Sequence, residues 1–364
     1  DLITSRQRHY HDRIMLGLFT AETAYDTPLA TWDTTTAYSM RDFDDASPHE
    51  TWDDVVETND TLVHQDEYPT IQELIRQSVR FTYTEPRVKP NTLGGLLTLT
   101  LGTRVTAQDG AAIAYRHKLT PVNPLSLPSM TAQISHMYSS QYRYSGVKSD
   151  GFSLRNNGPY LEFACPLLGS GSRAVSASTF VAAIDEAWLR WGDCHLYLRD
   201  ITGTTLSVPA TPVQGSTNLG SGAVDVSTRV ARVEVAHPNQ LLGERGYQAS
   251  TGTVRGSLLT TKRQTALSLE LYVKVETEAT ELAYYLTQAR LAFEWQCVGT
   301  TLIDATGTFY PGMILLLPCV QLRAIPRSEI DQFDTLRLEG QVLSDSVNPV
   351  LVAWIYSNKA AYLA

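Results

Sequence analysis

Alternation of apolar and polar residues dominates the chain. Threonine occurs 41 times and recurs in alternating runs such as residues 79–84 and 253–260. A period of two is typical of β-strands that bury one face. The pattern predicts further strands over residues 129–135, 151–155, 161–165, 194–198, 230–236, 267–276, 312–324, 335–343 and 350–356. We therefore expect a protein built mainly of β-strands.

Two segments instead show the spacing of helices. Residues 280–295 carry apolar side chains at intervals of three and four, namely Leu282, Tyr285, Leu286, Ala289 and Phe293. Thr277 is a suitable N-terminal cap, and Glu278 and Glu281 suit the positive end of the helix dipole. A second helix is predicted over residues 91–101, where Pro90 suits the first turn despite the unfavourable Gly94-Gly95 pair.

The predicted strand and helix occur twice. An offset of 189 residues places Tyr83 on Tyr272, Leu93 on Leu282 and Leu97 on Leu286. Further matches pair Leu127-Pro128 with Leu317-Pro318, and residues 151–158 with residues 333–340. We interpret this as two copies of one unit, residues 1–175 and 176–364. Chance alignment of strand-rich sequence is the alternative, because the identities are few.

Charge and cysteine content narrow the classes of function. The net charge is −9, and residues 14–70 hold thirteen acids against one base, Arg41. An acidic chain disfavours tight DNA binding but is compatible with a surface that DNA passes without adsorbing. Cys165, Cys194, Cys297 and Cys319 are widely spaced, so we expect reduced, buried side chains. The longest apolar stretch, residues 313–320, is too short to cross a membrane, and no signal-peptide pattern opens the chain.

The search for catalytic and metal-binding patterns finds only weak candidates. His9, His11 and Asp12 have no third ligand at a suitable spacing. The acids Asp42, Asp44, Asp45, Asp53 and Asp54 lack the glycine and glutamate of a calcium-binding loop, so a solvated acidic loop is the expected reading. No phosphate-binding or nucleophile-elbow pattern occurs. We expect no catalytic residues, no metal and no cofactor, although distant carboxylates could still pair in space.

Tyrosines cluster between residues 138 and 144. Tyr138, Tyr142 and Tyr144 could stack on bases or sugars, but on a strand we expect them to pack across a hairpin or a subunit seam. Together with Trp52 they are the candidate inter-subunit contacts.

Two phrases carry a resemblance to a known family. One runs from Tyr142 through Ser145-Gly146 and Lys148-x-Asp150-x-Phe152-x-Leu154 to the small residues of 167–172. The other is Glu22-x-x-Tyr25-Asp26-Thr-Pro28, in which Asp26 stands where glycine is usual. Together they resemble the major tail tube proteins of long-tailed bacteriophages.

The resemblance implies a fold and an assembly. It implies a mainly β (α+β) protein of two similar antiparallel β-sandwich or barrel units, each with one flanking helix, plus long arms and hairpins. Neighbouring subunits would join their inner sheets into a tube wall, and stacked rings would form a virion tail assembled in the host cytoplasm. Single-unit members form sixfold rings, so a duplicated chain would use three copies. Residues 14–70 and 106–128, poor in periodic apolar residues, would contact other subunits.

The same resemblance implies a passive conduit. The partners would be further copies of the chain, a tape-measure protein, tail tip and terminator proteins, and double-stranded DNA in transit, with no membrane insertion. A lumen lined by acids would repel DNA. The candidate lumen-facing acids are Asp150, Glu162, Glu270, Glu276 and Asp334.

Two other functions stay open. A carbohydrate- or receptor-binding β-sandwich would use exposed aromatics such as Trp32, Trp52 and Tyr142 as a platform. A glycoside hydrolase would need two carboxylates about 5 to 9 Å apart in a cleft.

Overall fold

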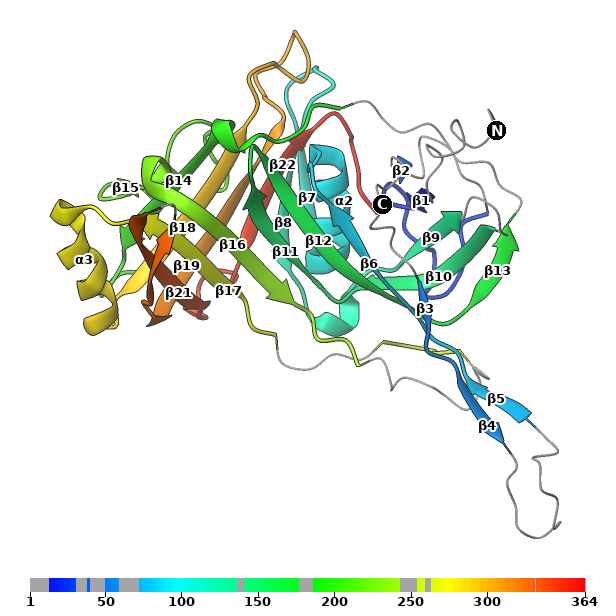
Figure 1. Cartoon of the computed structure of the whole chain (residues 1–364). Helices are drawn as coiled ribbons and strands as arrows, with labels where there is room; N and C mark the ends of the chain where they lie inside the picture. The colour runs from blue at the N-terminus through cyan, green and yellow to red at the C-terminus, as the bar shows by residue number, and fades with distance from the viewer. Residues whose placement is uncertain are drawn as a thin grey trace, which may run out of the picture.

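Figure 1 shows a computed structural model of the chain, and the prediction of a mainly β protein is confirmed. The structure describes residues 13–30, 38–39, 50–58, 72–135, 141–176, 186–242, 254–258, 263–330 and 332–363. Within these ranges there are two α-helices, α2 (Pro90–Leu101) and α3 (Val275–Leu286). Neither is long and apolar enough to cross a membrane.

The strands run through both halves of the chain. The N-terminal half contains β1 (Arg13–Leu16), β2 (Tyr38–Ser39), β3 (Thr51–Trp52), β4 (Val55–Thr58), β5 (Gln72–Arg76), β6 (Val79–Glu85), β7 (Gly102–Gln108), β8 (Tyr115–Pro121), β9 (Met130–Ser135), β10 (Gln141–Ser149), β11 (Gly151–Asn157), β12 (Tyr160–Gly169) and β13 (Arg173–Ser176). The C-terminal half contains β14 (Cys194–Asp200), β15 (Val224–Asp225), β16 (Val230–Pro238), β17 (Ala266–Tyr272), β18 (Arg290–Val298), β19 (Gly312–Ala324), β20 (Arg327–Ile330), β21 (Phe333–Val342) and β22 (Val352–Ser357). Except for the separate β4–β5 hairpin, all belong to one antiparallel pairing network.

Helix α2 lies where the sequence predicted it, and all twelve of its residues are buried. The Gly94-Gly95 pair is explained by close packing. A Cβ atom at Gly94 would lie 2.5 Å from the ring of Tyr362, and one at Gly95 would lie 2.7 Å from the Cβ of Leu18. The glycines therefore let the helix approach both neighbours, which offsets their poor helix propensity.

Helix α3 differs from its prediction. It begins at Val275, after Lys274 at the N-cap, and ends at Leu286, so Thr277 lies inside the first turn. Phe293 belongs to β18, whose residues are buried on both faces. Apolar residues on consecutive positions of such a strand also satisfy the helical spacing, which is why the predicted helix extended too far.

Two predicted strands also require correction. The strand predicted over 267–276 ends at Tyr272, because α3 begins three residues later. Residues 254–258, within the run 253–260, form no regular strand. There Arg255 is buried and donates hydrogen bonds to the carbonyl oxygen of Gly169 and to Ser78 Oγ. The alternating residues of this segment therefore belong to a loop anchored by Arg255 and not to a strand.

The two halves have the same order of paired strands. In the N-terminal half the order is β1–β9–β10–β12–β6, and in the C-terminal half it is β14–β18–β19–β21–β17. In each half the third strand also pairs with the last one, as β10 with β13 and β19 with β22. The fourth strand forms a hairpin with the strand before it, β11–β12 or β20–β21, and the fifth leads into the helix. A duplication would produce this correspondence, and the division into residues 1–175 and 176–364 stays a prediction.

The superposition with an offset of 189 is one residue out of register in the strand before the helix. Tyr83 faces the core, as do Val79 and Phe81, whereas Tyr272 is half-buried and alternates with the buried Leu269 and Leu271. A shift of one residue exchanges the two faces of a strand. An even offset such as 188 would bring core residues onto core residues.

Strands of one half pair with strands of the other, and this pairing gives the two halves a common core. Strand β16 pairs with β17 of its own half and with β11 of the other. Strand β8, within the segment 106–128 that we expected to contact other subunits, pairs with β22 of the same chain. The buried apolar side chains therefore form one large cluster that runs through both halves, with a smaller second cluster beside it. The four cysteines are buried, and none forms a disulfide.

Candidate functional site

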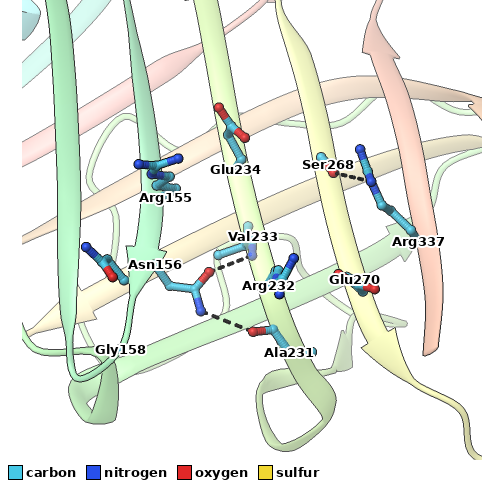
Figure 2. A pocket seen from close by; sticks show the side chains of 11 residues that line it. Arg155, Asn156, Gly158, Ala231, Arg232, Val233, Glu234, Ser268, Glu270 and Arg337 are labelled. Atoms are coloured by element: carbon cyan, nitrogen blue, oxygen red, sulfur yellow. Dashed lines mark hydrogen bonds between the residues drawn. The ribbon is translucent and has the colours of Figure 1, made fainter. Parts of the chain in front are cut away.

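One face of the large sheet is polar where the two halves meet. Strands β12, β11, β16, β17 and β21 are neighbours in that order, and Figure 2 shows their outer face. Along β16, Val233 and Val235 point into the core and alternate with the exposed Arg232 and Glu234. We call the outer surface the polar face and define it by Arg155, Glu162, Arg232, Glu234, Ser268, Glu270, Arg337 and Glu339.

The charges of the polar face form two rows across the strands. In the first row, Arg155 lies directly opposite Glu162 on one side and Glu234 on the other. In the second row, Glu270 lies directly opposite Arg232 and Arg337. Opposite charges that face each other across antiparallel strands attract by about 0.2–1 kcal/mol per pair. The first row keeps one excess negative charge and the second row one excess positive charge, so the two adjacent rows balance each other within the sheet.

Hydrogen bonds fix the first row. The guanidinium of Arg155 lies 2.5 Å from Glu162 Oε1, and the side-chain amide of Asn157 donates to Glu162 Oε2 at 2.7 Å. Asn156 continues the ladder beyond the end of the backbone pairing, because its amide donates to the carbonyl of Ala231 and accepts from the backbone N–H of Val233 (Figure 2). The joint between the halves is therefore closed by side chains as well as by strands.

In the second row, Glu270 is held as a carboxylate. It is buried, which acts to raise its pKa, but Ser328 and Thr335 donate hydrogen bonds to Oε1 at 2.5 and 2.7 Å. These bonds and the charges of Arg232 and Arg337 outweigh the burial, so the pKa lies below its usual range. The carboxylate therefore stays charged and engaged with neighbours on its own sheet.

The five acids predicted to line a lumen do not gather on one surface. Glu162 and Glu270 lie on the polar face. Asp150 lies at the end of that face, in a depression that is also lined by Thr82. Glu276 is in the first turn of α3 and not on a strand, because the helix begins at Val275. Asp334 alternates with the outward residues of β21, so it points to the opposite side from Arg337.

The polar face also carries arginines and glutamates that the sequence analysis did not single out. Arg155, Arg232, Glu234, Arg337 and Glu339 lie on it. All five occupy alternate positions of strands that were predicted, so the pattern of charges on those strands was the available signal. Only the pairing shows that the first four each lie opposite a charge of the other sign, whereas Glu339 lies opposite Ser268 and forms an ion pair with Arg337 on its own strand.

Three of the four predicted contact residues, Trp52, Tyr142 and Tyr144, form a cluster at the far end of the N-terminal half. The ring of Trp52 meets that of Tyr142 edge-on with centroids 5.3 Å apart, and the guanidinium of Arg173 lies 4.0 Å above the Trp52 ring. Tyr144 is fully buried, accepts a hydrogen bond from Trp52 Nε1 and donates one to Glu50. Tyr144 therefore belongs to the core of its own chain and is not an exposed contact residue.

The two phrases that resemble tail tube proteins converge in space. Glu22 accepts hydrogen bonds from Ser129, Thr131 and the backbone N–H of Gly146. Asp26 accepts hydrogen bonds from Ser145 and Ser170, which lie in the two parts of the phrase that begins at Tyr142. Its φ is 64°, in the left-handed region that favours glycine, which explains why glycine is usual there. The two phrases therefore mark a structural junction and not a reactive site.

No group of His, Cys, Asp or Glu side chains suited to a metal ion is found in the described ranges. His9, His11, Asp12, Asp42, Asp44 and Asp45 lie outside those ranges, as do Tyr138 and Trp32. Of the remaining acidic loop, Asp53 lies 3.9 Å from Arg80, and Asp54 forms an ion pair with Arg173 at 2.7 Å. These two carboxylates therefore neutralise arginines at the same end of the N-terminal half.

Comparisons with known proteins give little further guidance. No family model matches the chain. No curated protein matches it either. One similar solved structure is the Hcp1 protein of the E. coli EAEC 042 pathovar in a doubly mutated form, at 13% identity and a TM-score of 0.24, covering 44% of this chain and 96% of that one. A TM-score this low supports no conclusion about fold or function.

Proposed function

We propose that this chain is a structural protein that polymerises as stacked rings into a tube, with the polar face turned toward the lumen. The single observation that carries the proposal is the polar face itself, whose first charge row crosses the joint between the halves from Glu162 and Arg155 to Glu234. A sheet face built from two repeated halves is suited to continue from one copy to the next. The residues resembling tail tube proteins support a place in the tail of a bacteriophage.

The lumen would be self-neutralised and not uniformly acidic. Arginines that already face glutamates have little free charge to offer a phosphate backbone, and the glutamates add local repulsion. DNA would therefore pass without adsorbing. In this proposal three copies form each ring, and the further partners are the tape-measure, tail tip and terminator proteins.

The alternative of a carbohydrate- or receptor-binding protein has less support. The depression on the polar face is lined by Arg155, Asn156, Asn157, Gly158, Ala231, Arg232, Val233, Glu234, Ser268, Glu270 and Arg337, a set without an aromatic residue. Trp52 and Tyr142 pack against each other, so they do not form an open platform. A sugar-binding cleft normally needs aromatic faces that are free to stack.

Electron microscopy of the purified protein tests the proposal. Over a series of rising concentrations, with and without tail initiator proteins, we expect hollow filaments of constant diameter. A protein that stays monomeric throughout would overturn the proposal, and binding to a glycan array by that monomer would favour the alternative.

A further inference from the structure

In the part of the chain that the structure describes, two surfaces at opposite ends of the molecule have unpaired strand edges, whereas the equivalent strands at the joint between the two halves are paired. At one end lie α3 and β21, which pairs with β20, and at the other lie β3 and β13 (Figure 1). Strand β20 pairs only with β21, and β3 pairs only with β6, among the described residues. The strand order β3–β6–β12–β11–β16–β17–β21–β20 is therefore open at both ends.

The joint inside the chain shows what such ends can bind. There β11 of the N-terminal half pairs antiparallel with β16 of the C-terminal half, and α2 packs against β22. In the matching strand orders, β20 takes the place of β11, and α3 that of α2. On the opposite side, β3 precedes and pairs with β6 as β16 does with β17, and β13 pairs with β10 as β22 does with β19.

The helices show the difference between an occupied end and an open one. All of α2 is buried, whereas Val275 and Leu286 of α3 are 87% and 76% exposed. Helix α3 is nevertheless fixed to its own half, because Glu281 forms an ion pair with Arg229 at 2.6 Å in a largely buried position. The helix is thus held in place with apolar side chains uncovered.

The opposite end also exposes apolar side chains on a rigid base. Val175 of β13 is 71% exposed, and Trp52 of β3 is 41% exposed although Arg173 and Tyr142 hold its ring. At the internal joint, Val235 of β16 takes the place that Trp52 takes on β3. Val235 is fully buried because β11 lies beside it. Exposed apolar clusters and free strand edges of this kind mark sites of protein association.

We infer that the β20–α3 end of one copy joins the β3–β13 end of a second copy, with β20 and β3 paired antiparallel and α3 packed against β13. This inference rests on the proposed function and names the surfaces that would close the ring. The occupant is a second copy of this chain, because the contact repeats a joint that the chain already makes within itself. Such a contact joins two different surfaces, so its repetition closes a ring or extends a chain.

Cysteine cross-linking tests the strand pairing. Thr51→Cys is combined in turn with Ser328→Cys, Glu329→Cys and Ile330→Cys, and each protein is oxidised mildly at assembling concentration. Directly opposite residues of antiparallel strands have Cα atoms about 4.5–5.5 Å apart, which a disulfide can span. We expect one of the three pairs to give covalent dimers and closed trimers, while each single variant and the control pair Thr51→Cys with Val347→Cys give none. The native cysteines are buried and should not interfere.

A second, matched pair of variants tests the helix contact. Val175→Asp places a charge in the inferred joint, whereas Val347→Asp places one at a residue of equal exposure, 72%, outside it. We expect Val175→Asp to raise the concentration needed for assembly about tenfold or more, because desolvating a charge at an interface costs at least 1.4 kcal/mol. Val347→Asp should leave assembly unchanged, and both should melt like the wild type.

The two proposals fail separately. Hollow filaments without any of the three cross-links, and with Val175→Asp and Val347→Asp assembling alike, would overturn the inferred joint and leave the tube intact. Cross-linked closed trimers that never stack into hollow filaments would support the joint and overturn the tube.

Discussion

Asp26 Oδ1 and Ser170 Oγ lie 2.6 Å apart although 144 residues separate them in the chain. The same oxygen accepts a second hydrogen bond from Ser145 at 2.6 Å. Asp26 thus ties the segment after β1 to both β10 and the turn after β12. This junction is where the recognisable phrases of the sequence meet, so its geometry can be tested by substitution.

Substitutions of Asp26 should separate backbone strain from hydrogen bonding. Asn keeps an acceptor and tolerates a positive φ, Gly removes the strain but also the acceptor, and Ala keeps the strain without the acceptor. We expect stability to fall in the order wild type, Asp26→Asn, Asp26→Gly, Asp26→Ala, with a loss of about 2–3 kcal/mol for Ala. Urea denaturation measures this order, and an Ala variant as stable as the Gly variant would contradict it.

The stability of the protein should decrease above about pH 6.5 because of Glu85. Burial raises the pKa of Glu85 to about 8, and burial also raises that of Glu186 to about 7. The folded state then holds protons that the unfolded state releases near pH 4.5, so these groups lower the free energy of unfolding as pH rises toward 8. His117 and His237, whose pKa burial lowers to about 4, act in the opposite sense only below pH 6.5.

Glu85→Gln tests this assignment. The variant should lose less stability than the wild type between pH 6.5 and 9, by about 1–3 kcal/mol, because glutamine does not ionise. Thermal melting at several pH values measures the difference. The exposed Glu329→Gln should follow the wild type, and a Glu85→Gln curve parallel to the wild type would refute the role of Glu85.

The two halves should unfold together. Leu154 of β11 lies directly opposite Val235 of β16 in the joint, and both are buried in the common core. Leu154→Ala should cost about 2–4 kcal/mol of stability for the whole chain. Fluorescence and circular dichroism in urea should give one coincident transition for both proteins. Two separated transitions in the wild type would show that the joint does not couple the halves.

Removing the glutamates of the first row should create affinity for DNA. Arg155 faces both Glu162 and Glu234, so the double variant Glu162→Gln, Glu234→Gln leaves its charge unbalanced. In fluorescence anisotropy at low salt we expect measurable binding of a double-stranded oligonucleotide that weakens as salt rises, and none for the wild type. Glu276→Gln with Glu329→Gln removes the same charge elsewhere and should not bind. Equal binding by both double variants would show that only net charge matters.

Local patterns predicted the strands better than the ends of the helices. Strands such as β11 and β16 were identified because polar and apolar residues alternate on a half-buried strand. At α3 the pattern continued into β18, since consecutive buried residues fit either period. The glycine pair of α2 has poor helix propensity, and only the close approach of Tyr362 and Leu18 shows why the pair is tolerated.

The candidate site was only partly accessible from the sequence. Glu162 and Glu270 were identified as candidates, but their arginine partners were not, because Arg155 and Arg232 reach them from neighbouring strands. Tyr144 was predicted to lie at a subunit contact, because the sequence does not show whether an aromatic residue on a strand faces the core or the outside.

The sequence by itself determined where strands form, which residues of each strand share a face, and that a strand–helix pair occurs twice. These features depend on interactions within a few residues of the chain. The tertiary structure alone decided that Arg155 lies between Glu162 and Glu234, and that β20 and β3 are left with free edges. Strand pairing joins residues that are distant in the chain, and a shift of one residue reverses every face, so local periodicity does not determine it.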